Sequence, residues 1–188
     1  MKLNKKEKEF LLKLSRKTLE EYFSDGEKLE VDESSLSEKF KVKLATFVTL
    51  TKKGQLCGCI GQILPKFPLY KDIINNTLSA AFSDPRFPQL EEKELAVIKI
   101  EISILTIPKR IIYDDYDDLI KKIKPNIDGI ILQSGFSQAT FLPDVWKQLP
   151  KTEDFLTNLS LKAGLTPAAW KNSETEFFHY QTESFSEK

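Results

Sequence analysis

The chain has little histidine, methionine or cysteine: one, one and two residues among 188. One histidine and two cysteines are too few for a zinc site made of protein ligands alone, which normally needs about four. No stretch approaches the ~20 apolar residues of a membrane-spanning helix, and the charged residues 1–10 are unlike a signal peptide. We therefore expect a cytoplasmic protein without a bound metal or cofactor.

The chain also lacks an excess of charge of either sign, because 28 basic residues balance 28 acidic ones. This argues against a dedicated nucleic-acid-binding protein, which usually carries a basic stripe. Hydrophobic residues make up 40% of the sequence and include 13 phenylalanines, which is enough for a real core. The length predicts a single domain over residues 1–188, built as one body or as a large and a small lobe.

The two cysteines lie two positions apart, in the segment 56–61. In an extended strand their Cα atoms are about 6.6 Å apart, and their Cβ atoms lie well beyond the ~4 Å that a disulfide requires. We therefore expect free thiols, which suit a reducing compartment. The same segment contains Gly58 and Gly61, and glycine weakens a strand. This predicts a bend, or a group that approaches the backbone closely.

The hydrophobic spacing predicts helices mixed with strand hairpins. Lys52–Gly54 is typical of a hairpin turn, and Pro85 predicts the end of the helix before it. Thr152 is expected to cap the last helix. Because hairpins outnumber clear parallel units, the predicted class is α+β. Helical spacing covers residues 5–23, 68–82, 113–123 and 153–163, and strand patterns cover residues 40–51, 55–64, 94–105, 130–133 and 176–185.

Cys59 is the first candidate for chemistry, as a nucleophile or a ligand. A thiol is mostly protonated at neutral pH, so it needs a cation, a helix N-terminus or a base nearby. The alternative is a small buried hydrophobic residue. Gly58 and Gly61 could offer backbone amides to an anion, or they could form a β-bulge or a close strand–helix contact. A regular strand would place Cys57, Cys59 and Gly61 on one face.

Three charged residues in other segments could complete a site with Cys59. Asp84 and Arg86 lie in a rigid, proline-rich turn, where the arginine could bind a carboxylate or phosphate or only pair with Asp84. Glu101 lies on the polar face of the most regular strand, as a general base or as a solvated charge. His179, the only histidine, is interpreted as a surface or packing residue, although a Cys–His pair remains an alternative.

These segments resemble the AMMECR1 domain family. Residues 56–61, Leu-Cys-Gly-Cys-Ile-Gly, are similar to the family signature Leu-Arg-Gly-Cys-Ile-Gly, and Asp84–Phe87 matches its Asp-Pro-Arg-Phe block. The resemblance extends from about Phe40 to Phe185. Further blocks follow in the family order at residues 101–105, 129–132, 139–143 and 155–165.

The resemblance implies an α+β fold with a curved mixed sheet flanked by helices, and a large and a small lobe. It implies component A of the AmmeMemoRadiSam system, with a Memo-like protein and a radical S-adenosylmethionine enzyme as partners. One position departs from the signature, because Cys57 stands where the family has an arginine. This chain therefore lacks that cation, and Arg86 could replace it only if the two segments converge.

Three hypotheses of function follow. The leading one is an enzyme or enzyme subunit in which Cys59 and Glu101 are catalytic and Gly58, Gly61, Asp84 and Arg86 bind the substrate. The second is a non-catalytic scaffold or adaptor whose exposed apolar surface binds a partner. The third, RNA binding or modification, is opposed by the balanced charge.

Overall fold

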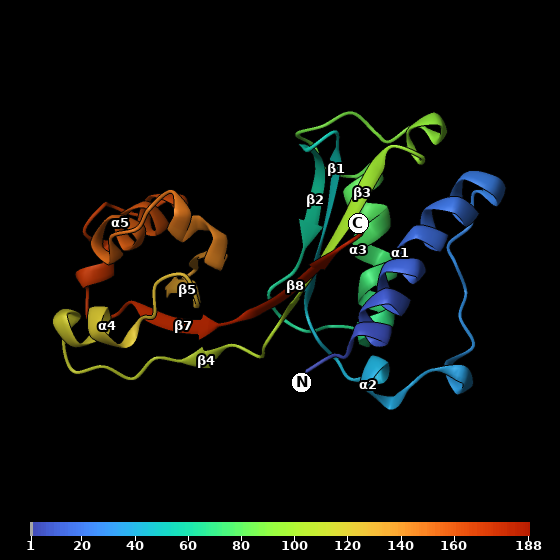
Figure 1. Cartoon of the computed structure of the whole chain (residues 1–188). Helices are drawn as coiled ribbons and strands as arrows, with labels where there is room; N and C mark the ends of the chain where they lie inside the picture. The colour runs from blue at the N-terminus through green and yellow to red at the C-terminus, as the bar shows by residue number, and fades with distance from the viewer. Residues whose placement is uncertain (1) are drawn as a thin grey trace. The chain divides into compact units, whose positions relative to one another are not determined.

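The computed structural model describes residues 2–188, which divide into two compact units. Unit 1 contains the chain up to Ile107 together with Glu183–Lys188, and unit 2 contains Pro108–Thr182. Figure 1 shows each unit as its own sheet with its own helices. No helix formed by residues 2–188 is both long and apolar enough to cross a bilayer.

Unit 1 contains the long first helix and most of the strands discussed above. Helix α1 begins after Asn4, whose side chain accepts the Glu7 backbone N–H while the Glu7 carboxylate accepts the Asn4 N–H. It ends at Gly26, which has a φ of +72°. The elements are α1 (Lys5–Asp25), η1 (Glu33–Ser35), α2 (Glu38–Lys41), β1 (Thr46–Lys52), β2 (Gln55–Gly61), α3 (Leu69–Phe82), η2 (Glu92–Glu94), β3 (Ile98–Leu105) and β8 (Thr182–Ser186).

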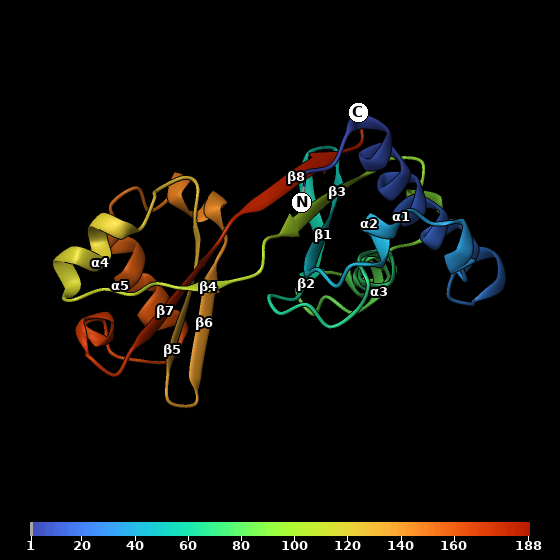
Figure 2. The ribbon, with the colours of Figure 1, turned by 90° about the horizontal axis from the view of Figure 1, so that it is seen from below.

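The sheet of unit 1 has the strand order β2-β1-β3-β8. The β1–β2 hairpin turns at Lys53 and Gly54, which both have positive φ. Helices α1 and α3 pack on one face of this sheet (Figure 2). That face is apolar, because every second side chain points to it. Its fully or almost fully buried residues include Val48, Leu50, Ile100 and Ile102.

A buried carboxylate ties α3 to the start of β1. Asp72 is fully buried and accepts the backbone N–H and the hydroxyl of Thr46, at 2.9 and 2.7 Å, and the amide of Asn76 at 3.0 Å. Gln62, which follows β2, also donates to it. Burial raises the pKa of Asp72 above its usual value, and these donors oppose that rise. The network therefore positions the helix against the hairpin.

Unit 2 has its own sheet and core. The sheet has the order β4-β7-β5-β6, and its core contains Trp146 stacked on Phe155 with ring centroids 3.7 Å apart. The indole N–H of Trp146 donates to the Asp128 carbonyl at 2.7 Å. The elements are β4 (Lys109–Arg110), α4 (Tyr116–Lys122), β5 (Gly129–Ser134), β6 (Ser137–Phe141), η3 (Pro143–Lys147), α5 (Thr152–Lys162), η4 (Ala169–Lys171) and β7 (Glu176–Tyr180).

The α+β class is confirmed, and four finer predictions are corrected. The strands form two four-stranded sheets and not one. The strand predicted from Phe40 starts at Thr46, because Phe40 lies buried in the short helix α2. The strand predicted over residues 176–185 is divided at Gln181, so that β7 pairs in unit 2 and β8 joins the sheet of unit 1. Thr152 is the first residue of α5, and Lys151 occupies the cap position.

Candidate functional site

The glycine- and cysteine-rich segment is strand β2, which lies at the edge of the unit 1 sheet. The pairing with β1 shifts by one residue, since Thr51 lies opposite Leu56 whereas Leu50 lies opposite Gly58. Cys57 is the extra residue of this bulge and packs against the core that α1 and α3 cover. The prediction that Cys57 and Cys59 share a face is therefore wrong, because the bulge separates them.

Cys59 lies on the opposite face of the sheet, which we call the outer face. It is half-buried and lies directly across from Thr49 of β1, whose hydroxyl donates to the Cys59 sulfur at 3.2 Å. Thr49 in turn lies directly across from Glu101 of β3. Directly opposed residues of antiparallel strands share a face, so Cys59, Thr49 and Glu101 form one row across three strands.

The row continues onto β8. The hydroxyls of Ser103 and Ser184 are 2.8 Å apart, and the Glu187 backbone N–H donates to the Ile100 carbonyl at 2.9 Å. Both pairs fit one antiparallel register, which places Ser186 opposite Glu101. The outer face therefore carries a thiol, hydroxyls and a carboxylate in one line.

The Asp84–Phe87 turn meets β2 at Cys59. The Asp84 carboxylate accepts the Cys59 backbone N–H at 2.8 Å and binds the Arg86 guanidinium through both oxygens, at 3.0 and 2.8 Å. Arg86 also donates to the Cys59 carbonyl at 3.1 Å. We call this arrangement the edge clamp, since Asp84 and Arg86 occupy the backbone groups of Cys59 that a further strand would pair with.

The edge clamp has a clear electrostatic signature. The Asp84 side chain is only 2% exposed, whereas that of Arg86 is 57% exposed. Bonds from Arg86, and then the Cys59 N–H, hold the pKa of Asp84 well below its usual range against the effect of burial. Asp84 raises the pKa of Arg86 in return. On the inner face, burial raises the pKa of the Cys57 thiol, although Lys52 opposes this shift.

The two glycines allow close approaches. A Cβ on Gly58 would lie 2.1 Å from the backbone oxygen of Ala80, so only glycine lets helix α3 pack here. A Cβ on Gly61 would lie 2.3 Å from the Thr46 carbonyl oxygen and 2.4 Å from the Phe47 ring. Backbone N–H groups alternate in direction along a strand. The Cys59 N–H points away from β1 to the open edge of the sheet, so the N–H of Gly61 does the same and the N–H of Gly58 points toward β1.

The structure thus brings five of the six predicted site residues to one region of unit 1. Cys59, Asp84 and Arg86 are in direct contact, Gly61 follows on the same edge, and Glu101 shares the row. Gly58 lies beneath them against α3. Sequence reasoning missed Thr49, although its place between the apolar Val48 and Leu50 marks it as an outer-face residue.

The only histidine lies in unit 2, outside this region. The Nδ1 atom of His179 is 3.6 Å from the carboxylate of Asp128, which is almost fully buried. Gln181 and the Lys124 backbone N–H also donate to that carboxylate, at 3.2 and 3.0 Å. Within residues 2–188, no three histidine, cysteine or acidic side chains are grouped as metal ligands would be.

The fold and the site define a class: an α+β protein with two four-stranded sheets and a half-buried cysteine held at a sheet edge by an Asp–Arg pair. The family model of AMMECR1 matches residues 12–185. The chain therefore belongs to the AMMECR1 family.

Relatives from archaea agree with this assignment. A protein from Methanothermobacter thermautotrophicus is 35% identical over 186 residues, covering 98% of this chain and 96% of that protein. A protein from Methanosarcina mazei is 37% identical over 180 residues, covering 94% and 89%. The crystal structure of uncharacterized protein PH0010 from Pyrococcus horikoshii matches with a TM-score of 0.86 and 32% identity, over 95% of this chain and 90% of that one.

Proposed function

We propose that this AMMECR1 protein is an enzyme or enzyme subunit that uses the outer face of unit 1, with Cys59 as the reacting group. It acts in the AmmeMemoRadiSam system of the cytoplasm, together with a Memo-like protein and a radical S-adenosylmethionine enzyme. The observation that carries the proposal is the row Cys59–Thr49–Glu101, in which a hydroxyl donates to the thiol sulfur at 3.2 Å.

Each residue of the row has a distinct task. The Cys59 thiolate adds to a carbonyl carbon of a small organic or protein-bound substrate, the π electrons of the C=O bond move onto its oxygen, and the thiol proton passes to the Glu101 carboxylate. Thr49 lies between them and stabilises the thiolate through its hydroxyl. Two strand spacings place the Cys59 and Glu101 backbones about 10 Å apart, a distance that a bound water or the substrate bridges.

The edge clamp positions the thiol and presents a cation. Asp84 and Arg86 bind both backbone groups of Cys59, so they restrict the direction in which its side chain points. Arg86 remains more than half exposed and is available to a carboxylate or phosphate of the substrate. The outward N–H of Gly61 is a further donor for such an anion. Gly58 contributes by letting α3 approach.

Alkylation by iodoacetamide tests the proposal. Because the cysteines are two residues apart, the variants Cys57→Ala and Cys59→Ala isolate one thiol each. Cys59 is the only thiol left in Cys57→Ala, and Cys57 is the only thiol left in Cys59→Ala. At pH 7 Cys59 should react faster than Cys57, because burial raises the pKa of the Cys57 thiol. In the Cys57→Ala background, Thr49→Val should slow alkylation roughly fivefold, which corresponds to the loss of one hydrogen bond.

Thr51→Val is the matched control, because Thr51 is a half-buried threonine of the same strand whose cross-strand partner is Leu56. It should leave the rate unchanged. If Cys59 reacts no faster than the same thiol in urea-unfolded protein, or if both threonine variants behave alike, the catalytic role of Cys59 is refuted.

One observation favours the adaptor as a second function. Phe136 lies in the two-residue turn between β5 and β6 and is as exposed as an isolated residue, at 110%. An aromatic residue at a hairpin tip is well suited to enter a partner's apolar pocket. Co-purification with the Memo-like protein separates the functions: Phe136→Ser would abolish it for an adaptor, whereas Cys59→Ala would not.

A further inference from the structure

A groove on unit 1 lies between helix α1 and the C-terminal segment of the chain. It has a volume of about 630 Å³. Its apolar residues are Leu12 and Phe185, and the stems of long cationic side chains add to this surface. The groove thus has the apolar floor and polar walls of a binding surface. Its remaining lining residues are Lys5, Lys8, Glu9, Lys13, Arg16, Ser186, Glu187 and Lys188.

One wall of the groove is an open sheet edge. Among residues 2–188, strand β8 is the last strand of the unit 1 sheet and pairs with β3 on one side only. The Glu187 N–H is directed to β3, where it donates to Ile100. Because backbone groups alternate in direction along a strand, those of Ser184 and Ser186 are directed to the open edge. An extended segment of another chain could pair with them.

The other wall, helix α1, carries more cationic than acidic side chains, although the whole chain is neutral. Lys5, Lys8, Lys13 and Arg16 line it against Glu9. Lys8 binds Glu183 at 2.7 Å and lies 5.7 Å from the centre of the Phe185 ring. Lys13 is exposed and forms no ion pair with any residue that the structure describes. This charge excess favours an acidic occupant.

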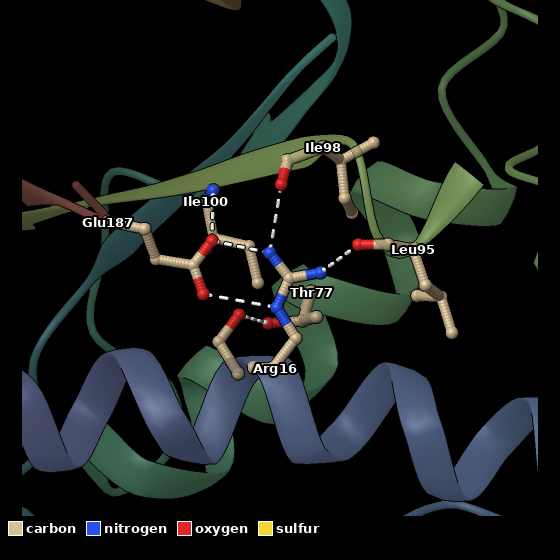
Figure 3. A network of polar contacts seen from close by, with 7 residues as sticks. Arg16, Thr77, Leu95, Ile98, Ile100 and Glu187 are labelled. Atoms are coloured by element: carbon tan, nitrogen blue, oxygen red, sulfur yellow. Dashed lines mark hydrogen bonds and ion pairs between the residues drawn. The ribbon is translucent and has the colours of Figure 1, made fainter.

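The groove is preformed, because a network of polar contacts fixes its two walls (Figure 3). Arg16 of α1 donates to the Leu95 and Ile98 carbonyls at 2.7 and 3.0 Å, and to the Glu187 carboxylate at 3.1 Å. The same carboxylate accepts the Ile100 N–H at 2.9 Å. Helix α1 and the segment after β8 are therefore held at a constant separation, which lowers the entropic cost of binding.

We propose that this groove binds an extended, acidic segment of a partner protein, which adds a fifth strand beside β8. Every second side chain of that segment is directed toward α1, where apolar ones contact Leu12 and Phe185 and carboxylates on the same face meet the lysines of α1. Backbone pairing provides general affinity, and the charges select the partner. This inference does not depend on the chemistry at Cys59.

Fluorescence anisotropy with a labelled synthetic peptide tests the proposal. The probe is a short peptide in which valine and glutamate take turns at every second position, with threonine between them, so that both lie on one face of the strand. It should bind the full chain. Lys13→Glu should weaken binding roughly tenfold or more, because it places like charge against the peptide. Lys6→Glu is the matched control: Lys6 is an exposed lysine of the same helix and does not line the groove. Equal losses for both variants would refute a specific site.

Two further probes test the strand pairing. In the first probe, methyl groups replace the amide hydrogens that would be directed to β8, so the peptide cannot pair with that strand. Its binding should fall to the level of a control peptide in which lysine replaces each glutamate. Ser186→Pro should have a similar effect, because it removes an outward N–H and leaves the bonds to β3 intact; circular dichroism checks that it folds. Full binding of the methylated peptide would refute strand addition. If the unmodified protein is a dimer in solution and Ser186→Pro makes it a monomer, a second copy of the chain occupies the edge instead.

Discussion

Asp84 and Cys59 are joined through the backbone: the carboxylate accepts the Cys59 N–H at 2.8 Å, across 25 positions of sequence. Arg86 completes the contact at the Cys59 carbonyl, at 3.1 Å. The two sequence blocks that resemble the AMMECR1 family therefore meet at one residue. The family signature has an arginine where this chain has Cys57. The guanidinium of Arg86 reaches the Cys59 segment in its place, although it is bound bidentately to Asp84.

The first prediction concerns the pH dependence of the edge clamp. The pKa of Asp84 is lowered in the folded protein, so its carboxylate stabilises the fold above its unfolded value near ~3.9. That contribution is lost as the pH falls through this value toward the lower folded one. Asp84→Asn should thus cost roughly 2 kcal/mol of unfolding free energy at pH 7, and less near pH 3. Urea unfolding at both pH values measures this.

Asp118→Asn is the control for the clamp. Asp118 also has a lowered pKa, through Lys122, but this pair lies on an exposed face of α4. Its replacement should change stability little at either pH. A cost of Asp84→Asn that is the same at pH 7 and pH 3 would contradict the electrostatic account of the clamp.

The second prediction concerns Gly58. Gly58→Ala would bring a Cβ within 2.1 Å of the Ala80 carbonyl oxygen, so strand β2 or helix α3 must shift. We expect a loss of about 1–3 kcal/mol or more, the usual cost of overpacking. Because the clash is with a backbone oxygen, Ala80→Gly should not restore stability. Urea unfolding of the single and double variants would decide, and full rescue would show that the side chain is responsible.

The third prediction concerns Arg16 and Glu187, which hold the C-terminal segment against α1. Their side chains are 20% and 23% exposed. A double-mutant cycle with Arg16→Ala and Glu187→Ala should give a coupling of about 1–3 kcal/mol, as for contacting residues in one network. The same cycle for Lys5 and Glu9, an exposed pair 4.0 Å apart, should give almost none. Equal coupling free energies for the two pairs would mean that the network of Figure 3 stabilises the protein no more than an exposed ion pair does.

Local patterns predicted most of the secondary structure. Helix α1 covers the residues whose spacing predicted it, and α3 occupies the residues between Pro68 and Ser83. The alternation in β3 correctly separated its buried isoleucines from Glu101. These features depend on backbone geometry within a few residues, which the order of apolar, glycine and proline residues records directly.

The register of the candidate site could not be read in the same way. A regular hairpin around Lys53 and Gly54 pairs Thr49 with Gly58, and only the bulge at Cys57 moves Cys59 into that position. Beside the bulge, Gly58 packs against α3, which is a contact between distant segments. A shift of one residue reverses the face of every side chain, so the site changes completely with it.

The amino-acid sequence by itself determined the α+β class, the hairpin turn and the family of this protein, because periodicity and motif order are local properties of the chain. The tertiary structure decided which thiol shares a face with Glu101, that Asp84 and Arg86 bind the edge of β2, and that residues 176–186 serve two sheets. These depend on strand pairing and helix packing between remote segments, whose free energies no single stretch of sequence contains.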